Sequence, residues 1–459
     1  MSKDEINVLI LAAGQGSRMK SATPKVLHRV AGQTMIDWVL ASVSTLHASQ
    51  LITVIGVGAQ RVQEHVGDRS KFVSQMVQLG TGHAVQQAQS ELKDSDGVTL
   101  IMSGDTPMFR PETLSELVAE HQNSNNAVTV LTAIAEDPTG YGRIVRGDDD
   151  TVIKIVEQKD ASVTERHIKE INTGVYVFDN QLLFDALSKV ENNNAQGEYY
   201  LPDTLDILRH DGQQIGAHTL HDFTESLGVN DRVALATANQ IMHGRINHEL
   251  MVSGVELIDP TSTYIDKTVK IAADTVIEGG VTILGDTVIG KGNLITQGSR
   301  IENSLIGDNN VITASHLESA QLANGVTVGP YAHLRPQTDL ADNVHIGNFV
   351  EVKDAKLGRD TKSGHLTYIG NATVGEDVNI GAGSIFVNYD GVNKFYSTVG
   401  DHAFIGSNTK IVAPVAIADE AITAAGSTVT EDVPKHAMAI ARERQTNKAD
   451  FWARMPHKQ

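Results

Sequence analysis

A run of isoleucines six residues apart decides the fold of the C-terminal half of the chain. Residues 265–301 read IDKTVKIAADTVIEGGVTILGDTVIGKGNLITQGSRI, with isoleucine at every sixth position. Neither the 3.6-residue period of a helix nor the two-residue alternation of an antiparallel strand explains this spacing. A hexapeptide repeat predicts a parallel β-helix, in which each apolar side chain points into a continuous core. After a break the spacing resumes at Leu322, Val328, Leu334, Leu340, Ile346 and Val352, and it returns at Val399, Ile405, Ile411 and Ile417.

The first half of the chain has a different sequence pattern, in which short apolar runs alternate with segments of helical periodicity. The runs at 7–11, 51–55, 100–102 and 127–131 predict buried strands, and the segments between them predict helices. Alternating strands and helices are typical of an α/β domain with a mostly parallel sheet. Between the halves, apolar residues spaced by three and four predict an amphipathic helix. The expected domains are therefore residues 1–232, a linker helix over 233–253, and a β-helix with a C-terminal tail over 254–459.

Composition limits the function classes. The chain has 459 residues, a formal net charge of −19 and no cysteine. The negative charge disfavours nucleic-acid binding, and no apolar run approaches the roughly 18 residues that a membrane span needs. The absence of cysteine excludes disulfides and thiolate chemistry, and the first residues lack the pattern of a signal peptide. We expect a cytoplasmic protein that binds neither nucleic acid nor membrane.

A glycine-containing turn directly follows the first predicted strand. Residues 11–19 read LAAGQGSRM, in which Gly14 and Gly16 allow the backbone to turn its N–H groups toward an anion. No Gly-Lys-Ser/Thr follows, and Met19 replaces the third glycine of a dinucleotide-binding turn. Arg18 and Lys25 instead supply two cations, which suit a triphosphate.

This turn, with Pro24-Lys25, resembles the signature of the sugar-phosphate nucleotidyltransferases. Further motifs resemble the N-acetylglucosamine-1-phosphate uridyltransferase branch of that family. They are QLGTGH at 78–83, GD at 104–105, GYGR at 140–143, VE at 156–157, EINTG at 170–174, NAQGEYY at 194–200 and GVN at 228–230. The resemblance implies a Rossmann-like α/β nucleotidyltransferase domain. Ser103 stands where the family often has tyrosine.

The resemblance also implies roles for individual residues. Mg²⁺ would be held by Asp105 and Asn230, and Arg18 would stabilise the transition state. Considered alone, Asp105 could form an Asx-turn and Asn230 could cap the linker helix. The sugar phosphate would contact Gly142, Glu157, Asn172 and Asn230. UTP would contact Leu11, Ala12, Ala13, Gly14, Lys25, Gln75, Gly80 and Thr81.

The hexapeptide repeat is interrupted by polar segments at 362–370 and 387–396. With LRP at 334–336 and NFVEVK at 348–353, these segments resemble the glucosamine-1-phosphate N-acetyltransferase half of a bifunctional family. The resemblance implies a left-handed β-helix, homotrimers and His365 as the general base, a role that suits the near-neutral pKa of imidazole. The sugar phosphate would contact Arg335, Lys353, Tyr368 and Asn379. Acetyl-CoA would contact Ala382, Asn388, Tyr389, Ser407, Ala425 and Arg442.

The prediction for the whole chain is a bifunctional enzyme of UDP-N-acetylglucosamine synthesis. Acetyl transfer from acetyl-CoA to glucosamine-1-phosphate would precede uridylyl transfer from UTP to N-acetylglucosamine-1-phosphate, with release of pyrophosphate. The product would feed peptidoglycan and other cell-envelope precursors. Two alternatives are a nucleotidyltransferase whose β-helix only oligomerises or regulates, and a non-catalytic sensor of nucleotide sugars.

Overall fold

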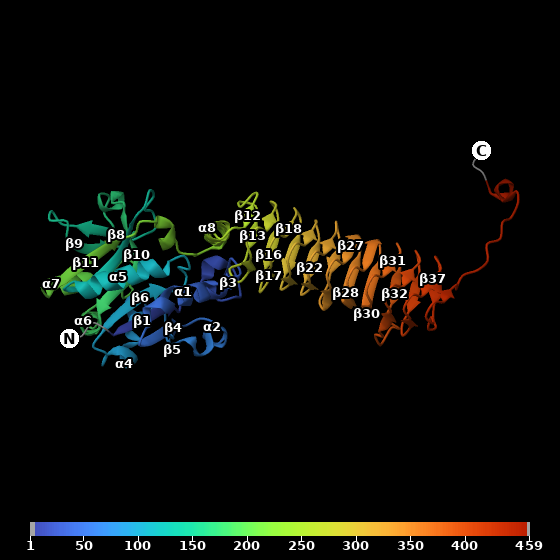
Figure 1. The fold of residues 1–459 in the computed structure, drawn as a ribbon. Coiled ribbons are helices and arrows are strands. Elements are labelled where there is room, and N and C mark those ends of the chain that lie inside the picture. Colours follow the sequence, from blue (N-terminus) through green and yellow to red (C-terminus); the bar gives the residue numbers. More distant parts are fainter. Residues whose placement is uncertain (1–4, 457–459) are drawn as a thin grey trace. The chain divides into compact units, whose positions relative to one another are not determined.

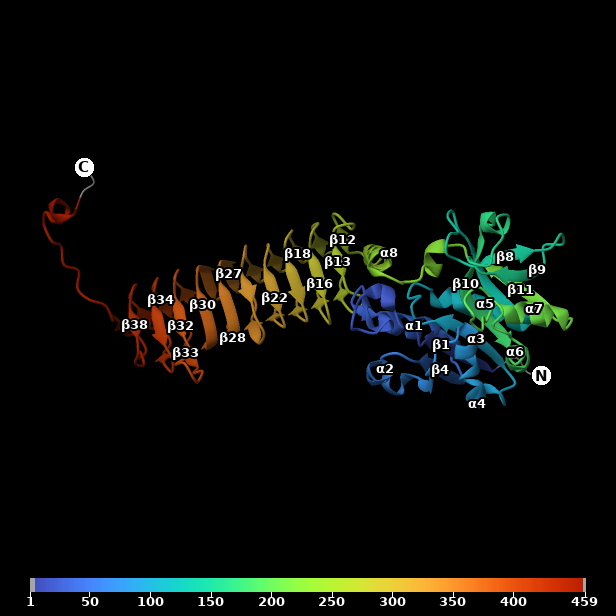
Figure 2. The ribbon, with the colours of Figure 1, turned by 180° about the vertical axis from the view of Figure 1, so that it is seen from behind.

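The computed structural model describes residues 5–456 and contains two compact units, which divide between Met242 and His243 (Figures 1 and 2). The division falls inside helix α8, Arg232–Val252, in the segment where the apolar spacing predicts a helix. The domain limits expected from the sequence stay a prediction. No helix among residues 5–456 combines the length and the apolar character needed to cross a bilayer.

The N-terminal unit is built around one twisted sheet. Its main path runs β11-β7-β10-β6-β1-β4-β5, and β8 and β9 extend it beside β10. β1 pairs in parallel with β4 and β6, and β11 pairs in parallel with β7, whereas β10 is antiparallel to β6, β7 and β8. The predicted mostly parallel sheet is therefore confirmed. The strands are β1 Ile6–Ala12, β4 Gln50–Ile55, β5 Lys71–Ser74, β6 Val98–Ser103, β7 Asn126–Ile134, β8 Arg143–Arg146, β9 Val152–Val156, β10 Glu170–Asp179 and β11 Gln214–Thr219.

Helices cover both faces of this sheet because its central strands are apolar on both sides. In β1, Val8 and Ile10 belong to the core with α1 (Met35–Val43) and α5 (Pro111–Asn123). Leu9 points the other way, into a core shared with α3 (Thr81–Gln86), α6 (Asn180–Leu187) and α7 (Asp203–His210). The smaller helices are α2 (Ala59–Val66) and α4 (Gln89–Leu92). Loops at the carboxyl ends of β1, β4 and β6 are left uncovered for a site.

The C-terminal unit is a stack of short parallel strands. One sheet of 11 described strands runs from β12 (Glu256–Leu257) to β39 (Met438–Ala439), and a second of 17 runs from β13 (Tyr264–Ile265) to β38 (Thr428–Val429). Ile265 lies beside Ile283, and Ile283 lies beside Ile301, so one coil takes 18 residues or three hexapeptides. These isoleucines are fully buried. The predicted β-helix of hexapeptide repeats is confirmed.

The coil length changes where the sequence interrupts the repeat. Between β28 (Glu351–Leu357) and β30 (Tyr368–Val374) paired residues are 17 apart, as in Val352 beside Ile369. Between β31 (Asn379–Ile380) and β34 (Phe404–Ile405) they are 25 apart, which leaves an inserted loop. Earlier coils also take 16 or 17 residues, as in Arg300 beside His316 and His316 beside His333, but these two interruptions carry the polar segments.

Candidate functional sites

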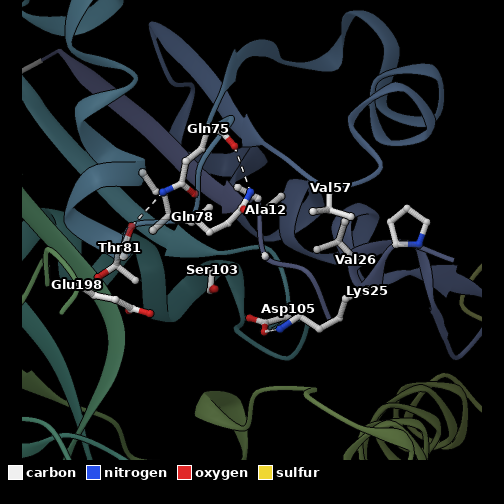
Figure 3. A pocket seen from close by; sticks show the side chains of 16 residues that line it. Ala12, Lys25, Val26, Val57, Gln75, Gln78, Thr81, Ser103, Asp105 and Glu198 are labelled. Carbon is white, nitrogen blue, oxygen red and sulfur yellow. Dashed lines mark hydrogen bonds and ion pairs between the residues drawn. The ribbon is translucent and has the colours of Figure 1, made fainter. Parts of the chain in front are cut away.

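A pocket in the N-terminal unit lies beyond the carboxyl ends of the central parallel strands, where sheets of this kind bind ligands (Figure 3). Every residue predicted to contact UTP lines it: Leu11 to Gly14, Lys25, Gln75, Gly80 and Thr81. The other lining residues are Pro24, Val26, Val57, Gln78, Ala84, Ser103, Asp105 and Glu198.

The glycine turn at the pocket contains two glycines, and the absence of a side chain serves a different purpose at each. Gly16 has a φ of 62°, and a Cβ atom there would lie 2.8 Å from the Cβ of Lys25. Glycine is therefore required for the turn itself. A Cβ atom on Gly14 would meet no protein atom within 4 Å. The absence of a side chain at Gly14 therefore leaves open space in the pocket and does not relieve a clash with another residue.

The loop that carries Gly80 is held by a distant segment. Tyr199 donates its N–H to Leu79 O at 2.8 Å and accepts from Gly82 N at 2.8 Å. Gly80 has a φ of 111°, and a Cβ atom there would lie 2.5 Å from Tyr199 O. Buried Gln75 donates from Nε2 to Gly80 O at 3.1 Å. This docking brings Glu198 to the pocket. Glu198 belongs to the NAQGEYY motif, but the sequence predicted no role for it.

A second pocket adjoins the first and shares Leu11, Thr81, Ser103 and Asp105 with it. Asn172 donates its backbone N–H to Gly142 O at 2.9 Å, which holds two strand ends together. A Cβ atom on Gly142 would lie 3.1 Å from Glu157 Oε1, so the absent side chain leaves the carboxylate accessible. The predicted sugar-binding residues Gly142, Glu157, Asn172 and Asn230 line this second pocket together with Arg18.

The carboxylate of Glu157 lines the second pocket, and Asp203 directly follows the lining residue Pro202. Burial raises the pKa of Glu157, and the charges of Asp160 and Asp203 raise it further. Burial also raises the pKa of Asp203 to about 6, with smaller contributions from Asp160 and Asp206. A hydroxyl-rich ligand that donates hydrogen bonds would find acceptors here.

Cations and oxygen ligands meet where the two pockets join. Asn230 Oδ1 accepts from Arg18 Nη2 at 3.0 Å and from Lys25 Nζ at 3.1 Å, and Lys25 also pairs with the Asp105 carboxylate. Val229 N donates to Asp105 O at 2.9 Å, which joins the two loops. Asp231 Oδ1, not Asn230, accepts from Ala234 N at the start of α8. The cap role considered for Asn230 is therefore taken by its neighbour, and its oxygen faces the site.

The donor set formed by Asp105 and Asn230 fits a divalent metal ion. Mg²⁺ accepts a carboxylate oxygen and an amide oxygen as ligands. In this structure the Asp105 carboxylate and Asn230 Oδ1 both contact the ammonium group of Lys25, so the two oxygens face one position. An ammonium ion between two oxygens shows that the position stabilises positive charge.

In the C-terminal unit, three cations gather beside the 17-stranded sheet: Lys353 on β28, Arg335 directly after β25 (His333–Leu334), and Lys394 in the inserted loop. The positive charge of Arg335, followed by that of Lys394, lowers the pKa of Lys353. Arg335 is oriented by an ion pair of 2.8 Å with Glu351. In the next coil Gly370 stands beside Lys353, and its absent side chain leaves room for the ring of Tyr368. Arg335, Lys353 and Tyr368 are thus brought together, whereas Asn379 lies on the 11-stranded sheet beside Lys362 and Phe404.

His365 ends strand β29 (Lys362–His365), and its side chain is exposed. Its Nδ1 lies 3.0 Å from Asn348 Oδ1 on β27 (His345–Asn348). Because an amide oxygen only accepts, this contact favours a proton on Nδ1 and leaves Nε2 with its lone pair. That tautomer is the one that a general base requires.

The residues predicted to contact acetyl-CoA follow successive coils. Asn408 N donates to Ala382 O at 2.7 Å, and Gly426 N donates to Ser407 O at 2.8 Å, so Ala382, Ser407 and Ala425 form a column of small residues. Arg442 Cδ lies 3.7 Å from the place of a Cβ on Gly426, at the end of this column.

Asn388 is buried, and its Nδ2 donates at 3.3 Å to the Oη of Tyr368, a residue predicted to contact the sugar phosphate. Tyr389 Oη donates to Gly391 O at 2.6 Å. Asn388 also donates to Asn371 Oδ1 at 2.6 Å. Asn371 and Tyr396 both donate to the Asp354 carboxylate. Sequence reasoning assigned no role to Asp354, Asn371 or Tyr396. The signal in the sequence was the 17-residue spacing of Asp354 and Asn371, which places them on neighbouring coils.

Comparisons with known proteins agree with both units. The nucleotidyl transferase family model matches residues 7–228. The bifunctional protein GlmU of Streptococcus agalactiae serotype III is 55% identical over 449 residues, which cover 98% of each chain. GlmU of Streptococcus mutans is also 55% identical over 98% of each chain. GlmU of Latilactobacillus sakei is 54% identical over 98% of this chain and 97% of its own.

These matches span both units, so they apply to the β-helix as well as to the nucleotidyltransferase domain. The chain belongs to the GlmU family of bifunctional enzymes, which join a uridyltransferase to an acetyltransferase in UDP-N-acetylglucosamine synthesis, as the sequence predicts.

Proposed function

We propose that the chain acetylates glucosamine-1-phosphate in its C-terminal unit and uridylylates N-acetylglucosamine-1-phosphate in its N-terminal unit. Acetyl-CoA and UTP are the other substrates, and pyrophosphate leaves in the second reaction. The observation that carries the proposal is the pair of adjoining pockets, one lined by the predicted UTP residues and the other by the predicted sugar residues.

In uridylyl transfer the phosphate of the sugar attacks the α-phosphate of UTP, so two anions must approach each other. Arg18 and Lys25 lie where the two pockets meet and would reduce this repulsion. Asp105 and Asn230 would hold Mg²⁺, which when bound supplies further positive charge for the phosphates. Backbone N–H groups of the glycine turn would bind phosphate oxygens. The chemistry requires no nucleophile from the protein.

In acetyl transfer Arg335 and Lys353 would bind the sugar phosphate, with Tyr368 beside them. His365 Nε2 would take a proton from the sugar amine as the amine attacks the thioester carbonyl, and the carbon–sulfur bond would break to release coenzyme A. Ala382, Ser407 and Ala425 would offer a flat path for the acetyl-CoA chain, and Arg442 would meet its negative charge. The chain has no cysteine, so no thiol acyl-enzyme can form, and the acetyl group would pass directly to the amine.

We also propose that the chain acts as a homotrimer. Apart from buried Asn388, the acetyl-transfer residues lie on the outer faces of the coils. Asn379 belongs to the 11-stranded sheet, whereas Arg335 directly follows β25 of the 17-stranded sheet. A neighbouring subunit would bring both faces to one substrate. Analytical ultracentrifugation tests the trimer: a monomer under assay conditions with full acetyl transfer would contradict it.

A coupled assay tests both activities. Purified chain is given each sugar phosphate with UTP and Mg²⁺, with and without acetyl-CoA. N-acetylglucosamine-1-phosphate should yield UDP-N-acetylglucosamine without acetyl-CoA, whereas glucosamine-1-phosphate should yield it only when acetyl-CoA is present. Turnover of the first substrate without acetylation of the second would favour a β-helix that acts only as a scaffold.

A further inference from the structure

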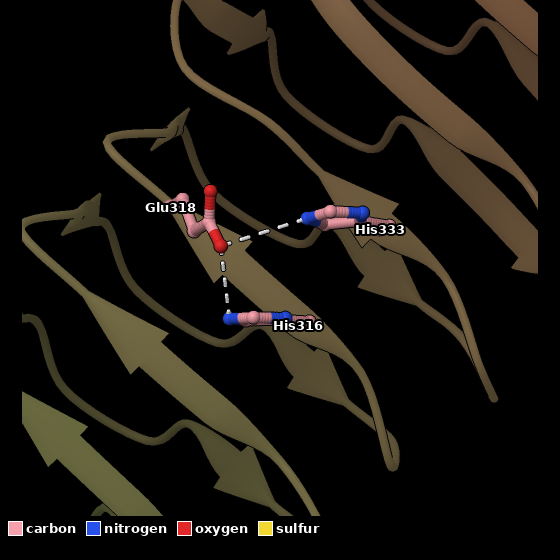
Figure 4. Close-up of side chains that lie close together, drawn as sticks. All are labelled: His316, Glu318 and His333. Atoms are coloured by element: carbon pink, nitrogen blue, oxygen red, sulfur yellow. Dashed lines mark ion pairs between the residues drawn. The ribbon is translucent and has the colours of Figure 1, made fainter.

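Two histidines and a glutamate meet on the 17-stranded sheet, outside the residues assigned to either reaction (Figure 4). His316 and Glu318 belong to β22 (His316–Glu318), and His333 belongs to β25 (His333–Leu334). Parallel pairing places His333 directly beside His316 in the next coil, with ring centroids 5.0 Å apart and nearly parallel planes. Figure 4 shows the Glu318 carboxylate facing both rings.

The ligand atoms of this cluster are close together without being hydrogen-bonded. Glu318 Oε1 lies 3.2 Å from His316 Nε2 and 3.8 Å from His333 Nε2. Both Nε2 atoms are buried and have no hydrogen-bond partner among residues 5–456. A buried ring nitrogen without a partner is costly, and a metal ion would satisfy both nitrogens at once.

The spacing of the atoms suits a small tetrahedral ion. Metal–ligand bonds of about 2.0–2.1 Å imply about 3.4 Å between neighbouring ligand atoms. The two contacts of Glu318, 3.2 and 3.8 Å, bracket this value, and one atom from each of the three side chains lies within 4.8 Å of the others. The two ring planes are nearly parallel, at 11°, so binding requires the rings to turn until both Nε2 atoms face one ion.

We propose that His316, Glu318 and His333 form a binding site for a divalent transition-metal ion, with Zn²⁺ as the best fit. Two imidazoles and one carboxylate are a ligand set typical of zinc, which binds imidazole through a neutral ring nitrogen. The three side chains are each 38% exposed, so the ion can enter from solvent and a fourth position stays open for water. Mg²⁺ prefers oxygen ligands and should not compete.

The test is a zinc titration of the full-length chain. Chelator-stripped protein is placed in excess Mg²⁺, which occupies the oxygen site of the N-terminal unit, and Zn²⁺ is added against a chromophoric chelator. The parent should bind one Zn²⁺ per chain. His316→Gln and His333→Gln should each weaken binding at least about 100-fold, because losing a direct ligand should cost no less than the 10–100-fold typical of losing a supporting residue.

His402→Gln is the matched control, because His402 lies on the same β-helix and pairs with a single carboxylate, Asp377, at 3.3 Å. This variant should bind zinc like the parent. Absence of zinc binding by the parent, or equal affinity in parent and both cluster variants, would overturn the proposal and leave a stacked histidine pair.

Circular dichroism and melting curves without zinc establish that the variants fold. If they do not, zinc-edge anomalous scattering from parent crystals decides. A peak between the three side chains supports the site, and its absence at saturating zinc overturns it.

Discussion

Arg18 and Asn230 are 212 residues apart in the chain and hydrogen-bonded in the N-terminal unit, whereas the site contacts of the C-terminal unit mostly join neighbouring coils. His365 and Asn348 are 17 residues apart, and so are Asn388 and Asn371. The first site is assembled by loops that converge at the end of a sheet, and the second by side chains that a repeating scaffold brings into columns. If two separate sites do two separate reactions, damage to one should leave the other working.

The largest expected effect of a single substitution is that of His365→Ala. A general base contributes typically about 10²–10⁴-fold, so the rate of acetyl transfer should fall by that factor. Uridylyl transfer and the melting temperature should stay close to those of the parent, because the side chain is exposed and lies in the other unit. Separate assays of the two reactions measure the effect.

His402→Ala, at an exposed histidine of the same unit, is the control and should leave acetyl transfer unchanged. Loss of both activities in His365→Ala, together with a lower melting temperature, would mean that His365 supports the fold.

Arg18→Ala should have the opposite effect on the two reactions: a loss of uridylyl transfer while acetyl transfer is retained. Removal of a preorganised charge that stabilises the transition state costs about 10²–10³-fold in kcat, so uridylyl transfer should fall by at least about 10²-fold. Acetyl transfer should persist. Arg29→Ala removes an exposed arginine whose guanidinium donates to Gly32 O, outside both pockets, and it should behave as the parent. A normal kcat in Arg18→Ala would remove Arg18 from the mechanism.

Asp105→Asn should raise the Mg²⁺ requirement of uridylyl transfer. The amide keeps the shape of the side chain but loses the charge that attracts the ion, so half-maximal rate should need at least about 10-fold more Mg²⁺. Asp148→Asn, in an exposed turn, is the control. Superimposable Mg²⁺ titrations for parent and Asp105→Asn would show that Asp105 does not hold the metal.

The smallest expected effect concerns stability and pH. The pKa of Asp203 is raised from 3.8 to about 6, mainly by burial, so the folded state loses stability as pH rises through this window and the carboxyl ionises. Asp203→Asn removes this loss. Its melting temperature should exceed that of the parent above about pH 6, and the difference should shrink toward pH 4.

Asp185→Asn, at an exposed position on α6, should show no such trend. A pH-independent difference between Asp203→Asn and the parent would contradict the raised pKa.

The contrast between the units also explains what the sequence could predict. Period six identifies the buried positions of the coils, so Ile265, Ile283 and Ile301 could be assigned to the core without a structure, whereas their alignment in one column follows from the strand pairing. The glycine turn and its neighbours could be recognised as a motif, but the spacing could not show that Asn230 meets Arg18, because long-range loop contacts leave no period. The same limit hid Glu198, which reaches its pocket only through the docking of Tyr199 against Leu79.

Side-chain pairing in the C-terminal unit was hidden for another reason. The shortened coil and the inserted loop change the register locally, so Asp354, Asn371 and Tyr396 do not fall at a constant spacing. Asn379 could be picked as a polar interruption, but which sheet carries it depends on counting residues through those irregular coils. A repeat predicts its regular positions well and its exceptions poorly, and the exceptions carry the candidate chemistry.

The central claim is that the two chemistries belong to two separate units, and a truncation tests it most directly. A fragment of residues 1–252 retains the whole of α8, including the hydrogen bond of 2.9 Å from Ala31 N to Asn239 Oδ1. With UTP, Mg²⁺ and N-acetylglucosamine-1-phosphate, this fragment should make UDP-N-acetylglucosamine at a rate close to that of the full chain, and it should not acetylate glucosamine-1-phosphate. A folded, monodisperse fragment without uridylyl transfer would contradict the account.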